Sequence, residues 1–306
     1  MKVILIICWL TIFFNAKLWA QEDKLMNLSP VSTFNMFRES SYISVLGGAG
    51  NIEPLIFEAD IIPYYMLSIN RNAKWGIELS PRIILRMYNK DSYPVRTPSY
   101  MPRATFFYQV AGANDAKKDW ISYFSWYHHS NGQDGAFYNT DSVSINCLNG
   151  SFSTNFLELG LFFSEPDKKR SFIMNYHKLS VSYAYSLDDE IKSRYGRLRF
   201  LFDNQSSFDL SGMLRIFNQN CSNQMHKPYL IQGLRIGWLA GQMNHTNTFD
   251  WNRLNVRYTL SYKPSFLNDI NFFVQYYYGQ DYYNIYFYRN LHVFRFGIAA
   301  KALSFN

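Results

Sequence analysis

Residues that could hydrolyse an ester occur in the segment His128-His129-Ser130-Asn131-Gly132 and further along the chain at Asn155. A serine hydroxyl becomes a strong nucleophile when a histidine accepts its proton, and a third group must hold the histidine ring. Alternate side chains of a β-strand share a face, so His128 and Ser130 emerge together while His129 points to the other side. Asn155, at the start of the next apolar stretch, can reach His128 across an antiparallel pair. The spacing predicts a hydrolase site made of Ser130, His128 and Asn155.

The face that carries these side chains is otherwise apolar. It includes Trp120, Phe124 and Trp126 on the first stretch and Leu157, Leu159 and Leu161 on the second. A soluble hydrolase would not normally place its active site on an apolar outer face, whereas an enzyme that cuts lipids would. The residues alone also fit a polar strand end followed by a turn, since Asn131-Gly132 is a common turn pair.

The first twenty residues, 1–20, have the features of a secretory signal peptide. A positive residue precedes an apolar run over residues 3–14, and Ala20 precedes a charged segment. We expect cleavage after Ala20, because so short an apolar run does not span a bilayer comfortably; the alternative is an uncleaved anchor. Residues 21–41 would then form an N-terminal periplasmic segment and residues 42–306 the membrane domain.

The composition suits a protein that contacts lipid. The chain has 24 Tyr, 26 Phe and 7 Trp, an excess that the aromatic girdles of a membrane barrel would need. Its net charge of +7 favours contact with anionic headgroups. It lacks the blocks of basic residues typical of nucleic-acid binding, so we exclude that class. Cys147 and Cys221 follow the expected cleavage site; an oxidising envelope would permit them to pair, and the sequence leaves this open.

Short alternating stretches dominate the chain after residue 20, and none is long and apolar enough for a transmembrane helix. We predict thirteen strands, at residues 42–48, 54–66, 74–88, 102–112, 118–131, 151–164, 171–185, 195–204, 207–217, 229–241, 252–263, 270–279 and 291–300. Single-chain bacterial barrels have an even number of strands. We therefore expect one assignment to be wrong, with 42–48 and 229–241 the weakest.

Arginines inside these stretches indicate a barrel with a polar lumen. Arg197 and Arg199 alternate with Leu198 and Phe200, as expected when polar side chains face inward and apolar ones face lipid. A closed sheet also removes the open edges that lipid does not tolerate. We predict an all-β fold, a transmembrane antiparallel β-barrel of about 12 strands. The alternative is a soluble, aromatic-rich β-sandwich with one wet face.

The site segment resembles the signature of the outer-membrane phospholipase A family, H-x-S-N-G followed later by S-x-S-x-N. The second part matches Ser151-Phe152-Ser153-Thr154-Asn155. Two other stretches are similar to family motifs: Ser92–Pro102, which resembles S-S-P-F-R-x-x-x-Y-x-P, and the last hairpin, from Tyr278-Gly279 through Asp281 and Asn284 to Phe294–Gly297.

The resemblance implies a phospholipase of the outer membrane that hydrolyses phospholipid acyl esters. Ser130 would be the nucleophile, His128 the base and Asn155 the group that orients the base. The amide of Gly132 would help to hold the oxyanion. The resemblance extends over about residues 40–300 and is weak in the middle of the chain.

A catalytic calcium ion and a reversible homodimer are also implied by the resemblance. Calcium would lie near Ser151 and the backbone carbonyl of Gln133, with Ser92 contributed by a second subunit. Carbonyls, hydroxyls and water suffice as calcium ligands. The chain departs from the family here, because Gln133 replaces an arginine and the loop up to Ser151 is longer and carries Asp134 and Asp141.

Two alternatives remain open from the sequence. A lipid A deacylase of the outer membrane uses a similar His-x-Ser-Asn segment, with a glutamate as the orienting group; Glu158 is close by, but strand parity places it in the lumen. A non-enzymatic, porin-like barrel is the other alternative. The family also buries a glutamine in its dimer interface, and Ser80 falls near that position here.

Overall fold

The computed structural model describes residues 30–36, 38–46, 48–70, 72–111, 119–166, 174–210, 228–243, 246–267 and 269–300. The expected signal peptide, residues 1–20, lies outside these residues, and so does Cys221. Cys147 is described and has a free thiol.

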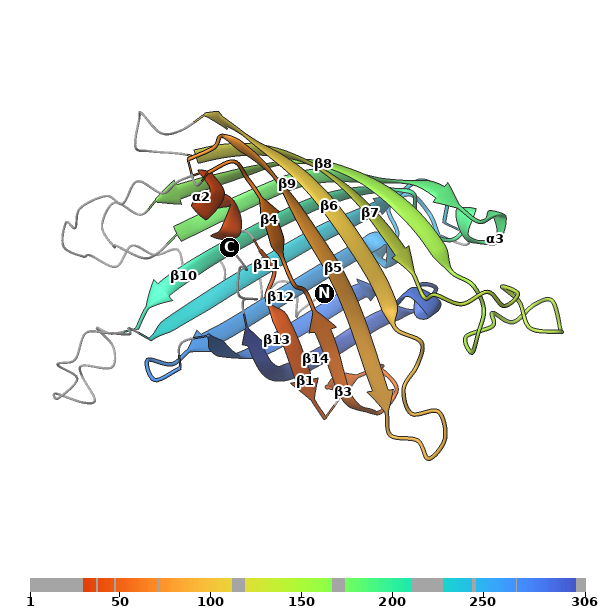
Figure 1. The fold of residues 1–306 in the computed structure, drawn as a ribbon. Helices are drawn as coiled ribbons and strands as arrows, with labels where there is room; N and C mark the ends of the chain where they lie inside the picture. The colour runs from red at the N-terminus through yellow and green to blue at the C-terminus, as the bar shows by residue number, and fades with distance from the viewer. Residues whose placement is uncertain are drawn as a thin grey trace.

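Twelve strands form a closed antiparallel sheet within the described residues (Figure 1). They are β1 (Ser41–Val45), β3 (Leu55–Ile61), β5 (Trp75–Tyr88), β6 (Ser99–Ala111), β7 (Asp119–Ser130), β8 (Ser153–Pro166), β9 (Met174–Leu187), β10 (Leu198–Asp209), β11 (Tyr229–Ala240), β12 (Leu254–Lys263), β13 (Ile270–Gln280) and β14 (Asn290–Ala300). Each pairs with the next in the chain, and β14 pairs with β1, so the sheet has no open edge. The predicted barrel of about 12 strands is confirmed.

The remaining elements are short. Strands β2 (Ala49–Gly50) and β4 (Tyr65–Leu67) pair with β14 and β5. The helical segments are α2 (Pro30–Met36), α3 (Asp189–Lys192), η1 (Trp251–Arg253) and η2 (Asn284–Tyr286). Within the described part of the chain, no helix has both the length and the apolar character needed to cross a membrane.

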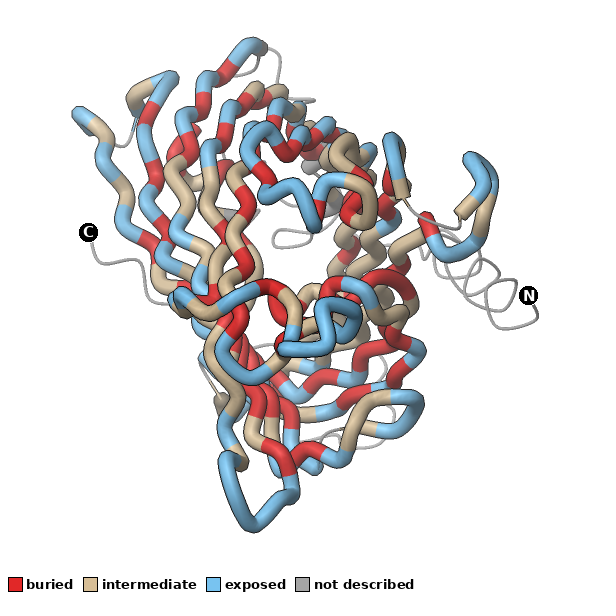
Figure 2. Tube along the Cα trace, turned by 90° about the vertical axis from the view of Figure 1, so that its right-hand side faces the viewer, coloured by how far each residue is buried: buried red, intermediate tan, exposed pale blue. Residues whose placement is uncertain are grey.

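The outer face of the barrel is apolar and the lumen is polar, the reverse of a soluble protein. On β8, Leu157, Leu159 and Leu161 are exposed, whereas Glu158 between them is only 4% exposed. Figure 2 shows buried and exposed residues alternating along the strands around the barrel. This pattern is stable when lipid rather than water covers the outer face. The architecture therefore fits an outer-membrane β-barrel and not a soluble β-sandwich.

Charged residues line the lumen in pairs. Arg86 donates two hydrogen bonds of 2.8 Å to the carboxylate of Asp281 and one of 2.6 Å to Glu58. Arg82 donates to Asp60 at 2.8 and 2.5 Å. A buried charge is costly unless it is paired and hydrogen-bonded. These pairs thus allow charged side chains to remain inside a closed barrel.

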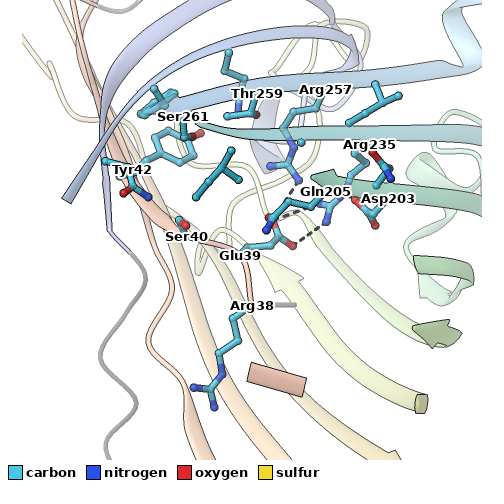
Figure 3. A pocket seen from close by; sticks show the side chains of 18 of the residues that line it. Arg38, Glu39, Ser40, Tyr42, Asp203, Gln205, Arg235, Arg257, Thr259 and Ser261 are labelled. Carbon is cyan, nitrogen blue, oxygen red and sulfur yellow. Dashed lines mark hydrogen bonds and ion pairs between the residues drawn. The ribbon is translucent and has the colours of Figure 1, made fainter. Parts of the chain in front are cut away.

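The described part of the N-terminal segment packs against the inner wall of the barrel at one end. Phe34 of α2 stacks on Phe107, with ring centroids 4.2 Å apart. Glu39 follows this helix and accepts hydrogen bonds from Arg235 at 3.2 Å and Arg257 at 3.1 Å (Figure 3). A cavity of about 140 Å³ lies beside these ion pairs. The segment therefore occupies part of the lumen at this end.

Among the described residues, two of the thirteen predicted strands fall on one observed strand, and residues 211–217 of the second lie outside the described part of the chain. The predicted strands 195–204 and 207–217 overlap a single observed strand, β10, which ends at Asp209. Its polar run Asn204-Gln205-Ser206-Ser207 has the composition of a turn, but these residues pair in register with β11. The two weakest predictions, 42–48 and 229–241, correspond to β1 and β11.

Candidate active site

His128 and Asn155 face each other across the β7–β8 ladder. They are direct partners in the register, and Ser130 is the partner of Ser153. The Nδ1 atom of His128 lies 2.8 Å from Oδ1 of Asn155. An amide oxygen only accepts hydrogen bonds, so Nδ1 is the donor, and in a neutral ring the lone pair is then on Nε2. This is the tautomer that a general base requires.

Strand parity places His128 and Ser130 on the lipid-facing side of the barrel. Both are half-buried, and Trp126, on the same face of β7, is exposed. His129 points inward and is 7% exposed. No hydrogen bond joins the side chains of His128 and Ser130 among the described residues. In ligand-free enzymes such bonds often form only when substrate binds.

The backbone turns sharply directly after Ser130. Gly132 has a φ of +66°, a left-handed conformation that glycine adopts without strain. Asn131 holds the start and end of the loop together: its Nδ2 donates to the Gly150 carbonyl at 2.7 Å, and its Oδ1 accepts from the Phe152 amide at 3.0 Å. In the sequence Asn131 stands out only as part of a turn signal, whereas in the structure its side chain also fixes the backbone that carries the Gly132 amide.

The residues expected to bind calcium lie at the same end of the barrel. Gln133 and Ser151 flank the neck of the β7–β8 loop, where the Ser151 amide donates to the Gly135 carbonyl at 2.9 Å. Ser92 is exposed in the β5–β6 loop, and this loop and the β7–β8 loop project from the same end (Figure 1). Carbonyl and hydroxyl oxygens are ligands that Ca²⁺ accepts, so the donor chemistry fits, but calcium takes roughly six to eight oxygens. Water molecules would have to supply part of such a set.

The β7–β8 loop carries two carboxylates, Asp134 and Asp141. Asp141 accepts hydrogen bonds from the Ser144 hydroxyl at 2.6 Å and the Val143 amide at 2.9 Å. These bonds, that from Ser144 first, hold the pKa of Asp141 below its usual value. Asp141 therefore caps a turn within the loop, whereas Asp134 is exposed beside Gln133. No group of three or more His, Cys, Asp or Glu side chains forms a metal cluster in the part of the chain that is described.

Two other residues from the sequence analysis lie in the lumen. Ser80 is 1% exposed and Glu158 is 4% exposed. Ser80 cannot contribute to an interface on the outer face, because strand parity turns Leu79 and Pro81 outward in its place. Glu158 faces away from His128 and pairs with Lys178 at 3.2 Å. The inward position of Glu158 agrees with the prediction from strand parity.

The chain is similar in fold to solved structures of other proteins. No protein-family model and no curated protein sequence matches the chain. Outer membrane phospholipase A from Escherichia coli superposes with a TM-score of 0.56 at 12% identity, covering 92% of this chain and 95% of that chain. An active-site mutant of that protein gives a TM-score of 0.54 at 12% identity, covering 92% and 95%.

A third solved structure is the outer membrane phospholipase dimer of Salmonella typhi with bound calcium. It superposes with a TM-score of 0.54 at 14% identity, again covering 92% of this chain and 95% of that chain. At this level of identity the likeness concerns the course of the backbone. The chain thus has a barrel similar in fold to outer membrane phospholipase A.

Proposed function

We propose that this barrel is a calcium-dependent phospholipase of the outer membrane that hydrolyses phospholipid acyl esters at its lipid-facing surface. One observation carries the proposal: a hydrogen-bonded His128–Asn155 pair lies on the lipid-facing side, two residues from Ser130. A polar pair on this face has a cost in lipid. A catalytic role explains why the pair lies there, two residues from a hydroxyl.

The proposed reaction is acyl transfer to serine followed by hydrolysis. The Ser130 hydroxyl attacks the ester carbonyl while Nε2 of His128 takes its proton. The imidazolium that forms is stabilised by the Asn155 oxygen. His128 then gives the proton to the lysophospholipid oxygen as the ester bond breaks. Water, deprotonated by His128, hydrolyses the acyl-serine and releases the fatty acid. The amide of Gly132 is the proposed donor to the oxyanion.

Calcium and a second subunit complete the proposed site. The residues that would hold the ion are Gln133, through its carbonyl, and Ser151, together with the partner subunit's Ser92. The ion would supply positive charge to the oxyanion when bound. Because Ser92 would come from the partner subunit, the proposal couples activity to a reversible homodimer, which fits an enzyme that is silent in an intact membrane.

Two features of the lumen favour this proposal over a porin-like barrel. At the end where the β7–β8 loop lies, Phe137, Phe152 and Phe287 are buried in one aromatic cluster with Tyr283 and Tyr286. At the other end, α2 packs inside the barrel against its inner wall. A channel needs a continuous water-filled path, and apolar packing at the mouth opposes one. The lipid A deacylase has less support, because Glu158 pairs with Lys178 in the lumen.

Release of fatty acid from phospholipid–detergent micelles, with and without Ca²⁺, tests the proposal. Ser122→Ala is the matched control for Ser130→Ala, because Ser122 lies on the same strand and face. Among the described residues its hydroxyl donates to the Tyr108 carbonyl, at 3.3 Å, and to no other group. We expect Ser130→Ala to abolish release and Ser122→Ala to leave it unchanged. Equal rates for wild type and Ser130→Ala, or no release from folded wild type with calcium, would refute it.

A further inference from the structure

The loop between β13 and β14 folds into the barrel mouth instead of projecting from it. Its residues Tyr283, Asn284, Ile285, Tyr286 and Phe287 are each at most 3% exposed. Four of them are apolar or aromatic and belong to the cluster at the mouth. Asn284 is the exception, a buried amide whose polar atoms must find partners.

Asn284 finds these partners directly behind the candidate nucleophile. Its side-chain Nδ2 donates to the Phe152 carbonyl at 2.8 Å and to the His129 carbonyl at 3.5 Å. Its backbone amide donates to the Ser99 hydroxyl at 2.8 Å. Asn284 thus contacts His129 of β7, Phe152 directly before β8, and Ser99 of β6. Asn284, Ser99 and Phe152 are each at most 2% exposed, so these contacts lie inside the barrel mouth.

The Phe152 carbonyl joins this contact to the turn that carries the proposed oxyanion donor. It also accepts a hydrogen bond from the Asn131 amide at 3.3 Å, and the Phe152 amide donates to Oδ1 of Asn131 at 3.0 Å. Asn131 lies between Ser130 and Gly132. A shift of Phe152 would therefore move the backbone of the proposed nucleophile and oxyanion donor together.

Buried charges hold the β13–β14 loop in place. The carboxylate of Asp281 accepts two hydrogen bonds from Arg86, each 2.8 Å, and its Oδ1 also accepts from the Tyr283 amide at 2.9 Å. Arg86 is fixed in turn by Glu58 at 2.6 Å. These charged groups are at most 4% exposed. The loop that presents Asn284 is therefore rigidly attached to the barrel wall.

We propose that Asn284 is a positioning residue for ester hydrolysis: from the lumen, it fixes the strand ends that present Ser130 and the Gly132 amide on the lipid-facing side. This inference rests on the function proposed above. Asn284 lies behind the sheet and does not touch substrate. Catalysis is sensitive to displacements of about 1 Å in the reacting groups, so its loss affects turnover more than substrate binding.

The kinetic test compares Asn284→Ala with Asn290→Ala in the folded, calcium-loaded protein. Asn290 is a matched control, because it lies nearby, at the start of β14, and its side-chain amide makes one hydrogen bond, to Asn252 at 2.7 Å, on the exposed surface. Asn284→Ala should lower kcat about 10- to 100-fold with KM changed less than about twofold. Asn290→Ala should leave both constants unchanged. An unchanged kcat in Asn284→Ala, or an equal fall in both variants, overturns the proposal.

Hydrogen exchange tests the positioning independently of activity. The amides of residues 129–135 should exchange at least about tenfold faster in Asn284→Ala, while those of β11 and β12 keep their wild-type rates. Asn284→Asp, which keeps the shape but loses the amide donor, is the second variant if Asn284→Ala does not fold. If wild type hydrolyses no phospholipid, the proposed function fails, and altered exchange alone then shows Asn284 to be structural. Unaltered exchange with active wild type refutes the positioning role.

Discussion

Removal of the Asn155 amide is the perturbation that isolates the orienting contact. In Asn155→Ala, His128 loses its 2.8 Å partner, but Ser130 and His128 still share a face of β7. The base then samples other ring orientations and both neutral tautomers, only one of which leaves Nε2 free. We therefore expect turnover to fall severely without reaching zero.

The magnitude follows from what the contact does during the reaction. Asn155 holds a neutral ring before proton transfer and an imidazolium afterwards, and a hydrogen bond to a charged group contributes about 1.5–3 kcal/mol. At about 1.36 kcal/mol for each factor of ten, kcat should fall roughly 10- to 150-fold. Loss of the Ser130 hydroxyl removes the nucleophile and should cost at least about 10⁴-fold.

The assay is fatty-acid release at saturating phospholipid and calcium, and the barrel itself provides a matched control. His177 and Asn204 form a second cross-strand pair, with Nδ1 3.0 Å from Nδ2, between β9 and β10. No serine lies two residues from His177, so Asn204→Ala should not change turnover. Wild-type activity in Asn155→Ala would remove this residue from the site, and a fall as complete as that of Ser130→Ala would refute the orienting role.

The other predictions address strand parity, calcium and the charged lumen. His128→Ala should lose nearly all activity and His129→Ala little, as measured by fatty-acid release; the reverse result would mean that the strand register is wrong by one residue. Excess chelator should stop hydrolysis and Ser151→Ala should raise the calcium concentration for half-maximal activity; full activity in chelator contradicts the calcium site. Arg86→Ala leaves the buried carboxylate of Asp281 unpaired, so denaturant unfolding in detergent should show a loss of about 3–5 kcal/mol, and an unchanged midpoint would contradict this.

The barrel could be predicted from the sequence because lipid-facing and lumen-facing residues alternate along each strand as apolar and polar residues. The parity of His128 and His129 follows from the period of two, and so does the inward position of Glu158. The alternation of apolar and polar residues did not predict the extent of β10, because a run of polar residues occurs inside this strand. At Asn204–Ser207 only the pairing with the neighbouring strand shows that the chain continues.

The supporting residues of the candidate site were harder to predict, because they depend on contacts between distant segments. Asn284 lies 155 positions from His129 and 132 from Phe152 in the chain, and nothing in the local pattern indicates that this loop folds inward. Asn131 was visible only as a turn residue, since its partners lie at the far end of a long loop. Such contacts arise because the β13–β14 loop folds into the mouth of the closed barrel and there meets residues of β6 and β7.

Covalent labelling is the measurement that tests the central claim most directly. A long-chain alkyl phosphonate ester in detergent micelles reacts with a serine only when a base activates it and donors hold the oxyanion. Peptide mapping by mass spectrometry should locate one adduct, on Ser130, that is absent in His128→Ala and retained in His129→Ala. An adduct on another residue, or an unlabelled Ser130 in protein that still releases fatty acid, would contradict the account.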